Sequence, residues 1–270
     1  MIEEFKDFWS RYIPYQLHPE DKKSLYNSNK AQIISENPDK FLINIDIDYL
    51  NSTYSKDLKN SSHNDLFQRT INPNAIHTNL YSKTFIGDIE KARIIILYGN
   101  PGLKLGDYMD EHEDNAFINE LNNDLSFSSN GFLFLRDVAR KTGGFNYWKN
   151  GNRFNKIIHG YSKAKGISIS EANSFLTKNI CLIESIGYHS TKTPLLKPHD
   201  FSSSLITKEL VHKYFLPKAR KGELIIFSWR QSSFWDLEPE SNVVIRNPNA
   251  AINSHFTDDE NKAILNFLTH

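Results

Sequence analysis

Hydrophobic residues follow two different patterns along this 270-residue chain. Up to residue 80 the sequence is polar, with aromatic residues at helical spacing near its start and a strictly alternating stretch at 43–49. Beyond it, short uninterrupted apolar runs alternate with segments whose apolar residues recur at helical spacing. We therefore expect an N-terminal extension over 1–80 (a helix, a short strand and a long loop) packed on an α/β domain over 81–270.

The uninterrupted apolar runs are typical of buried strands. Strands that are apolar throughout and separated by helices form a mostly parallel sheet that is covered on both faces. The pattern therefore predicts a three-layer α/β/α sandwich on a four-stranded, mostly parallel sheet. Its expected strands are 94–98, 180–186, 224–228 and 243–245.

Helix boundaries are marked by two capping boxes, in which a Ser or Thr side chain and a Glu three residues later satisfy each other's backbone N–H groups. Ser168 with Glu171 predicts the start of one helix, and Thr257 with Glu260 predicts the start of the last. A long helix after residue 204 is expected to end by Gly222.

Polar residues gather where three of the predicted strands end. In open parallel sheets, ligands bind outside the carboxyl ends of the strands. The loops after these strands are therefore expected to converge on one site. They are Gly99-Asn100-Pro101-Gly102 with Asp107 and Tyr108 beyond it, Gly187-Tyr188-His189-Ser190, and Arg246-Asn247-Pro248-Asn249.

Composition excludes several classes of protein. Lys and Arg total 32 and Asp and Glu total 32, so no overall basic field attracts nucleic acid and only a local patch could do so. A single cysteine, Cys181, excludes an intrachain disulfide and a four-cysteine metal site. The first residues lack a basic stretch followed by an apolar one, and no apolar run is long enough to span a bilayer, so we expect a cytoplasmic protein without membrane contact.

The glycines after the first strand match none of the common nucleotide or hydrolase motifs. The stretch GLKLGDY lacks the Gly-Lys-Ser/Thr of a phosphate-binding loop, and the chain has neither a dinucleotide-binding fingerprint nor a Gly-x-Ser-x-Gly elbow. Amides, tyrosine, histidine and backbone groups remain. Such groups position a water and stabilise an anion without a cofactor or a metal.

Three segments, NPGL, ICLIESIGYHS and VVIRNPNAAINSHF, resemble the signature segments of the uracil-DNA glycosylase superfamily. They are most similar to the mismatch-specific (thymine/uracil) branch. The first motif of that branch reads Gly-Ile-Asn-Pro-Gly, where this chain has Tyr98-Gly99 before Asn100. The resemblance covers residues 80–268 and implies the fold of that superfamily.

The resemblance implies a DNA glycosylase that hydrolyses the N-glycosidic bond of a flipped, modified or mismatched base. Asn100 would position the water, with Asp107 as a second candidate, and Asn247 would donate to the base or flank the sugar. The remaining candidates would contact the base or the DNA backbone. They are Gly99, Pro101, Gly102, Tyr108, Glu184, Tyr188, His189, Pro248 and Asn249.

Each assignment has a structural alternative. Asn100 and Asn247 could each only cap a turn before a proline, and His189 could be a loop histidine with satisfied hydrogen bonds. The aromatic residues Phe127, Phe132 and Phe134 fit a core better than a base-stacking platform. The acidic run at 107–114 fits a solvated loop better than a metal site.

Glu184 occupies the position at which the uracil-specific enzymes carry an asparagine that reads the base. An ionised carboxylate only accepts hydrogen bonds, so Glu184 is expected to disfavour uracil and to prefer a cytosine-like base with an exocyclic amine. Two alternatives remain: Glu184 pairs with a nearby Lys or Arg, or Ser185 faces the site instead.

DNA is the expected partner, held by local basic residues. They form two clusters and two single positions near strand ends: Arg136, Arg140 and Lys141; Arg153, Lys156, Lys163 and Lys165; Arg230; and Arg246. Scattered solubilising charge is the alternative. A member of the superfamily that binds nucleic acid or a modified nucleotide without cutting it, and an enzyme that hydrolyses free nucleosides, are the alternative functions.

Overall fold

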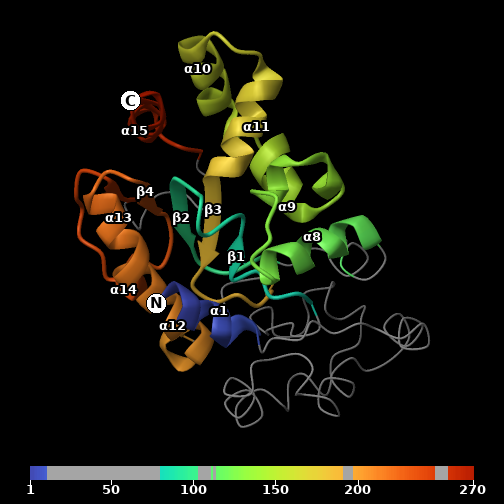
Figure 1. Cartoon of the computed structure of the whole chain (residues 1–270), viewed down its shortest axis with the longest axis vertical. Coiled ribbons are helices and arrows are strands. Elements are labelled where there is room, and N and C mark those ends of the chain that lie inside the picture. The colour runs from blue at the N-terminus through green and yellow to red at the C-terminus, as the bar shows by residue number, and fades with distance from the viewer. Residues whose placement is uncertain (11–79, 103–110, 112–113, 191–196, 247–254) are drawn as a thin grey trace, which may run out of the picture.

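A computed structural model describes residues 1–10, 80–102, 111, 114–190, 197–246 and 255–270 of the chain. The predicted strand at 43–49 lies outside these residues. The described part has an α/β fold with helices on both sides of a mixed sheet (Figure 1). The sheet has five strands: β1 (Phe85–Ile86), β2 (Ile94–Tyr98), β3 (Ile180–Glu184), β4 (Ile225–Ser228) and β5 (Val243–Ile245).

The prediction of a four-stranded sheet was wrong by one strand. The four predicted strands are present and parallel to their neighbours, and β1 adds an antiparallel edge by pairing with β3. β1 has two residues, which is too short for an alternating or continuous apolar pattern to be recognised.

The strand order is β1-β3-β2-β4-β5. The chain leaves β2 in the middle of the parallel set, forms β3 on one side of it, and then crosses to form β4 and β5 on the other side. β2 thus lies at the point where the direction of the connections reverses. In open parallel sheets a ligand crevice forms at such a point, outside the carboxyl ends of the strands.

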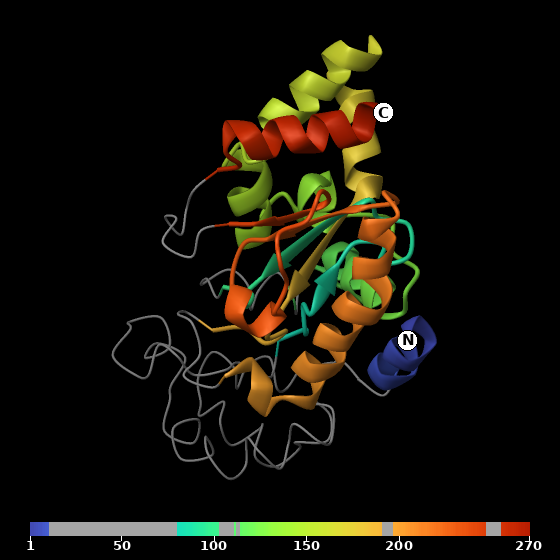
Figure 2. The same cartoon turned by 90° about the vertical axis from the view of Figure 1, so that its left-hand side faces the viewer.

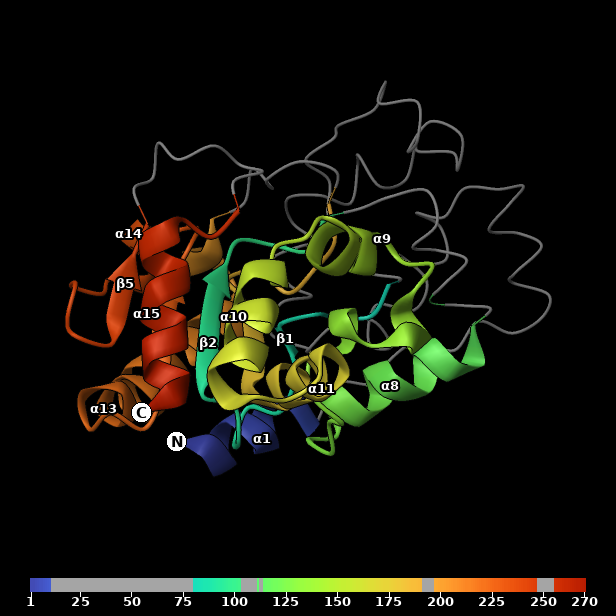
Figure 3. The same ribbon diagram turned by 90° about the horizontal axis from the view of Figure 1, so that it is seen from above.

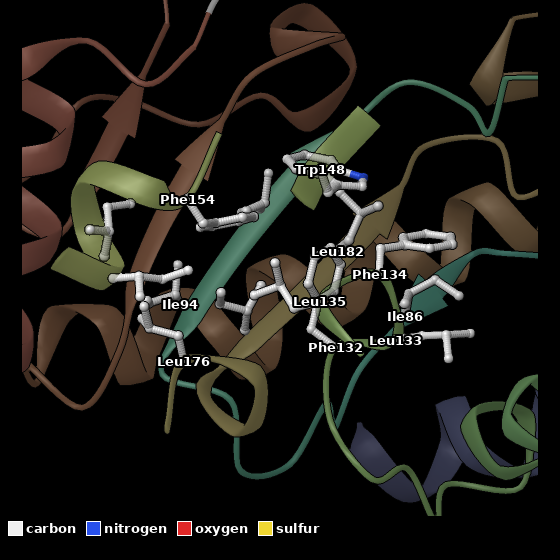
Figure 4. Close-up of a cluster of buried hydrophobic side chains, with 14 of the residues drawn as sticks. Ile86, Ile94, Phe132, Leu133, Phe134, Leu135, Trp148, Phe154, Leu176 and Leu182 are labelled. Carbon is white, nitrogen blue, oxygen red and sulfur yellow. The ribbon is translucent and has the colours of Figure 1, made fainter. Parts of the chain in front are cut away.

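Successive residues of the central strands point to opposite faces, and each face has its own apolar core. Ile94 and Ile96 of β2 lie in one core with Leu182 of β3, whereas Ile95 lies in the other core with Ile183. Figure 4 shows the first core, in which Trp148, Phe154 and several other side chains pack over the sheet.

The helices divide between these cores. The first core is covered by α8 (Asn115–Leu125), α9 (Gly143–Phe145), α10 (Asn155–Lys165), α11 (Ile169–Asn179) and α15 (Asp258–Thr269). The second is covered by α1 (Ile2–Ser10), α12 (Ser202–Leu210), α13 (Leu216–Arg220) and α14 (Ser232–Trp235), with a π-helical turn between α12 and α13. Figures 2 and 3 show α10, α11 and α15 together at one end of the sheet.

Both predicted capping boxes are present. The side chain of Ser168 accepts from the backbone of Glu171 at the start of α11, and Thr257 does the same with Glu260 at the start of α15. The helical run after residue 204 ends before Gly222, as predicted. Local side-chain chemistry was therefore sufficient to place these helix ends.

Gly187, just after β3, allows the segment before β1 to approach very closely. The Lys83 N–H donates to the Gly187 carbonyl oxygen at 2.8 Å. A Cβ atom at Gly187 would lie 1.9 Å from the Thr84 hydroxyl oxygen and 2.6 Å from that of Ser82. Because Gly187 has no side chain, the segment before β1 can pack directly against the loop that follows β3.

The substitution Gly187→Ala is expected to lower the free energy of unfolding by about 1–3 kcal/mol, because the new methyl group overpacks this contact. Gly102→Ala is the matched control, since a Cβ there meets nothing within 4 Å. It should leave stability unchanged or raise it slightly. Chemical denaturation measures both, and equal effects of the two substitutions would contradict the close approach.

Candidate functional site at the carboxyl ends of β2 and β3

The loops that follow β2 and β3 continue side by side beyond the sheet. The Ile186 N–H donates to the Gly99 carbonyl oxygen at 2.9 Å, and the Ser190 N–H donates to that of Pro101 at 3.2 Å. A parallel bridge joins Gly102 to Ser190. The structure thus brings together the first two of the three loops that the sequence placed at one site.

Asn100 is held between these two loops. Its side-chain amide nitrogen donates to the Ser190 hydroxyl oxygen at 2.8 Å and to the Pro101 carbonyl oxygen at 3.0 Å. The second bond is a local contact to the next residue, and it differs from a cap, in which the side-chain oxygen accepts from a backbone N–H. Both bonds use the nitrogen, so they fix the orientation of the side chain without using its carbonyl oxygen.

Glu184 is the last residue of β3 and pairs in register with Tyr98 of β2. It shares the face of Leu182, as the strand alternation predicted, whereas the hydroxyl group of Ser185 turns away and donates to the Gly99 carbonyl oxygen at 2.6 Å. The Glu184 side chain is buried, and within the described part of the chain its Oε2 has no hydrogen-bond partner.

Burial raises the pKa of Glu184 well above its usual range, and the nearby charge of Lys83 only partly opposes this effect. The carboxyl group therefore keeps its proton at pH values at which an exposed glutamate is ionised. Glu184 is therefore a weaker acid than the expectation of an ionised carboxylate assumed, because the sequence does not show that the end of β3 is desolvated.

His189 links the two loops. Its Nδ1 lies 2.7 Å from the Gly102 carbonyl oxygen, and its Nε2 lies 3.3 Å from Oε1 of Glu111. The ring is buried, and within the described part of the chain its Nε2 has no hydrogen-bond partner, so the alternative of a satisfied histidine holds only for Nδ1. The neighbouring Tyr188 is also buried and packs against Phe201, so its ring belongs to the interior of the protein.

Glu111 and Lys83 complete a buried polar cluster that sequence analysis missed, and the interpretation of the acidic run at 107–114 as a solvated loop was wrong for Glu111. The Lys83 ammonium group is hydrogen-bonded and ion-paired with Glu111, and the backbone N–H of Tyr81 donates to the second Glu111 oxygen at 2.8 Å. Burial acts to raise the pKa of Glu111, but the charges of Lys83 and His189 lower it below its usual value. Glu111 therefore stays ionised.

Tyr98 and Arg230 lie near each other at the carboxyl ends of the adjacent strands β2 and β4. The Tyr98 hydroxyl group lies 2.8 Å from that of Tyr147, and the Arg230 guanidinium group lies 6.0 Å from the centre of the Tyr98 ring. A Cβ atom at Gly99 would lie 3.7 Å from that of Arg230. Arg230 is thus the named cation that lies beside the Asn100 loop.

Arg246 anchors both ends of the segment that carries the third motif. Its backbone N–H donates to the Ser228 carbonyl oxygen at 3.0 Å, and its side chain stacks on Trp229 at 3.8 Å and is ion-paired with Glu260. A guanidinium nitrogen also donates to the His255 carbonyl oxygen at 3.1 Å. The candidates Asn247, Pro248, Asn249, Asp107 and Tyr108 lie outside the described residues.

Most of the other basic residues named from the sequence are engaged by neighbours. Arg136 forms a bidentate pair with Glu120, at 2.6 and 2.7 Å. Others pair with acidic or backbone groups: Arg140 with Asp137, Lys156 with Asp258, Lys165 with the Thr269 carbonyl oxygen, and Arg153 with the Tyr147 carbonyl oxygen. Lys163 and Lys165 lie at the end of α10, beyond the amino end of β3, away from the candidate site (Figure 1).

The aromatic residues at 132 and 134 are core side chains, in agreement with the structural alternative. Among the described residues no group of three or more His, Cys, Asp or Glu side chains is arranged to hold a metal ion. In the same part of the chain no helix is both long and apolar enough to cross a bilayer.

Comparisons with protein-family models, with curated proteins and with solved structures find no match for this chain.

The protonated state of Glu184 predicts how stability changes with pH. In the unfolded chain this carboxyl group ionises near pH 4.3, whereas in the folded protein it keeps its proton to a higher pH. The unfolded state then binds fewer protons, so Glu184 lowers the free energy of unfolding progressively as the pH rises from about 4.3 through the folded-state pKa. The advantage of Glu184→Gln over the native protein should grow across that window, by at most about 1.4 kcal/mol per pH unit.

Asp124 of α8 serves as a control, because its raised pKa should also make the protein less stable as the pH rises, but only up to a known pH. Burial raises the pKa of Asp124 to about 7, so the corresponding gain of Asp124→Asn should grow only from about pH 3.9 to about pH 7 and then stop. Denaturation across this pH range measures both variants. A difference between Glu184→Gln and the native protein that does not change with pH would contradict a protonated Glu184.

Proposed function

We propose that this protein is a DNA glycosylase-like hydrolase that cleaves the N-glycosidic bond of a base flipped out of DNA. The observation that carries the proposal is the position of two polar side chains at the carboxyl ends of adjacent parallel strands. Asn100 follows β2 with its amide nitrogen fixed, and Glu184 ends β3 with a buried oxygen that has no described partner. The resemblance of the three loop segments to the uracil-DNA glycosylase superfamily supports the same assignment.

Hydrolysis of this bond separates positive charge on the sugar from negative charge on the departing base. A water oxygen bonds to C1′ of the sugar while the bond from C1′ to the base nitrogen breaks, and the base leaves with the electron pair. The base then takes up a proton, and the water loses one. A residue that orients the water and donors that stabilise the base anion are what the protein must supply.

Asn100 suits the first of these roles. Its amide nitrogen is engaged by Ser190 and Pro101, so the side chain has a fixed orientation and its carbonyl oxygen can accept a hydrogen bond from the attacking water. An amide is a weak base, which is sufficient when the leaving group departs early. Asp107 and Asn247 remain proposals for a second water contact and for a donor to the base.

Glu184 suits the recognition of the base. A base that is taken out of the stack is read through hydrogen bonds along its pairing edge. A buried carboxyl group whose oxygen has no partner can form such bonds without competition from water. Its in-register neighbour Tyr98 keeps a protonated hydroxyl group, because burial and Tyr147 raise the pKa of Tyr98 well above its usual value.

Contact with DNA would depend on a few cations near the site and not on the overall charge, which is zero. Arg230 has the right position, since it borders the loop that carries Asn100. Phosphate contacts of this kind position the duplex and weaken as the salt concentration rises.

One observation favours a second function, the binding of nucleic acid or a modified nucleotide without cleavage. The Asn100 amide nitrogen makes a local contact to Pro101 that needs no catalytic explanation. Hydrolysis of free nucleosides is the third hypothesis. These functions differ in whether abasic sites appear in DNA.

The decisive experiment incubates the protein with labelled duplexes that carry uracil, mispaired thymine or modified cytosine, followed by alkaline cleavage of abasic sites. Asn100→Ala should reduce cleavage by about 100-fold or more, because it removes the group that orients the water. The control is Asn266→Ala, an exposed position on α15, which should retain full activity. Full activity of Asn100→Ala would eliminate its proposed role, and binding without abasic sites would establish the second function.

A further inference from the structure

Lys83 interacts with two buried glutamates, and it forms an ion pair with one of them. Its ammonium group pairs with Glu111 and lies 5.8 and 5.9 Å from the ring centres of Phe117 and Phe134. It also interacts electrostatically with Glu184, whose backbone N–H donates to the Thr84 carbonyl oxygen at 2.8 Å. All three charged side chains are almost completely buried, with Lys83 6% exposed, Glu111 1% and Glu184 4%.

Within the described part of the chain, Glu184 is buried without a direct ion pair, whereas Glu111 has one with Lys83. Lys83 contributes one positive charge, and Glu111, which also contacts His189 and the Tyr81 N–H, neutralises it. A second buried carboxylate would have no charge of its own to pair with, and a buried unpaired charge takes up a proton instead.

The ionisable groups around Glu184 come from three described elements. Tyr98 lies on β2, Lys83 lies on the segment before β1 and holds Glu111, and His189 lies on the loop after β3. Within the described part of the chain, Lys83 is the cation that acts on the Glu184 carboxyl group, but the ion pair of Lys83 is with Glu111.

The two states of Glu184 present different hydrogen-bonding patterns to a base. A neutral carboxyl group offers a donor and an acceptor side by side, whereas a carboxylate only accepts. Uracil, thymine and other lactam bases present a carbonyl oxygen beside a ring N–H, so they match the neutral group and are repelled by the carboxylate. A base with an exocyclic amine beside a ring-nitrogen acceptor matches the neutral group as well, and it still donates to the carboxylate, so only lactam bases depend on the neutral state.

We propose that the Lys83–Glu111 pair is a specificity determinant that admits lactam bases to the site, because it engages Lys83 and leaves Glu184 as a neutral donor and acceptor. This inference rests on the proposed function. Lys83 and Glu111 touch no substrate in it, and they act through Glu184 as positioning residues.

The test compares excision of uracil and of 5-methylcytosine at several pH values in Glu111→Gln and in the double variant K83M/E111Q. Loss of the Glu111 charge frees Lys83 to pair with Glu184, so the pH at which uracil excision declines should fall by about one unit or more. Above that pH, uracil excision should be about tenfold or more lower than in the native protein. Excision of any amine-bearing base should change much less. The double variant, which loses both charges, should recover the native preference and pH profile.

An unfolding measurement separates this inference from the proposed function. Each protein is compared with its own Glu184→Gln derivative, and the pH dependence of the stability difference reports the ionisation of Glu184 without any substrate. In Glu111→Gln the loss of stability with rising pH should shrink, and in K83M/E111Q it should return. An unchanged pH dependence in Glu111→Gln would overturn the role of the pair, even if uracil is excised.

Failure of all variants and of the native protein to form abasic sites would overturn the proposed function and the substrate class with it. A fall of uracil and 5-methylcytosine excision by the same factor in Glu111→Gln would also overturn the inference, because it would show a general structural effect. If Glu111→Gln does not fold, the double variant K83M/E111Q provides the test. Native-like selectivity in this variant would support the proposed role of the Lys83–Glu111 pair, and loss of the native pH profile would overturn it.

Discussion

Charge neutrality in a desolvated space constrains the candidate site more than any other interaction. Burying an ionised group without a partner costs several kcal/mol, so a buried cluster must contain matched charges or groups that change their protonation. Here Lys83 is matched by Glu111, and Glu184 is left with a proton. The chemical character of the end of β3 therefore depends on a pair located on other segments.

The same cluster joins three parts of the chain. Glu111 accepts from the backbone of Tyr81 before β1, holds Lys83, and lies beside His189 on the loop after β3. His189 in turn contacts the carbonyl oxygen of Gly102, which belongs to the loop of Asn100. A disturbance of the buried pair would thus reach both loops of the proposed site.

The sheet explains why these loops meet at all. β2 lies between β3 and β4, and the register of Tyr98 with Glu184 places the ends of two parallel strands side by side. Backbone hydrogen bonds then continue the alignment beyond the strands, as far as the bridge between Gly102 and Ser190. The parallel topology supplies convergence, and the side chains at the strand ends supply the chemistry.

Sequence reasoning succeeded where the signal was local. Continuous apolar runs gave the bounds of β2 and β5, and the capping boxes gave the starts of α11 and α15, because both signals depend on neighbours in the chain. The alternation of β3 also placed Glu184 on the correct face. The two-residue strand β1 carries no such signal.

The buried pair and the state of Glu184 could not be predicted in the same way. Lys83 and Glu111 are separated by 28 positions, and neither lies in a pattern that distinguishes it from a solvated charge. Whether Glu184 holds a proton depends on desolvation and on the partner chosen by Lys83, which only the folded structure provides. The burial of Tyr188, which the sequence presented as a loop residue, has the same origin.

The most direct test of this account observes the Glu184 carboxyl group itself. Carbon-13 NMR of protein labelled at the glutamate side-chain carboxyl carbons reports the protonation of each group, and the resonance absent from Glu184→Gln identifies the one from Glu184. The account predicts that the Glu184 resonance titrates at a higher pH than the resonances of exposed glutamates, while the Glu111 resonance titrates at a lower pH. A Glu184 resonance that titrates together with those of exposed glutamates would contradict it.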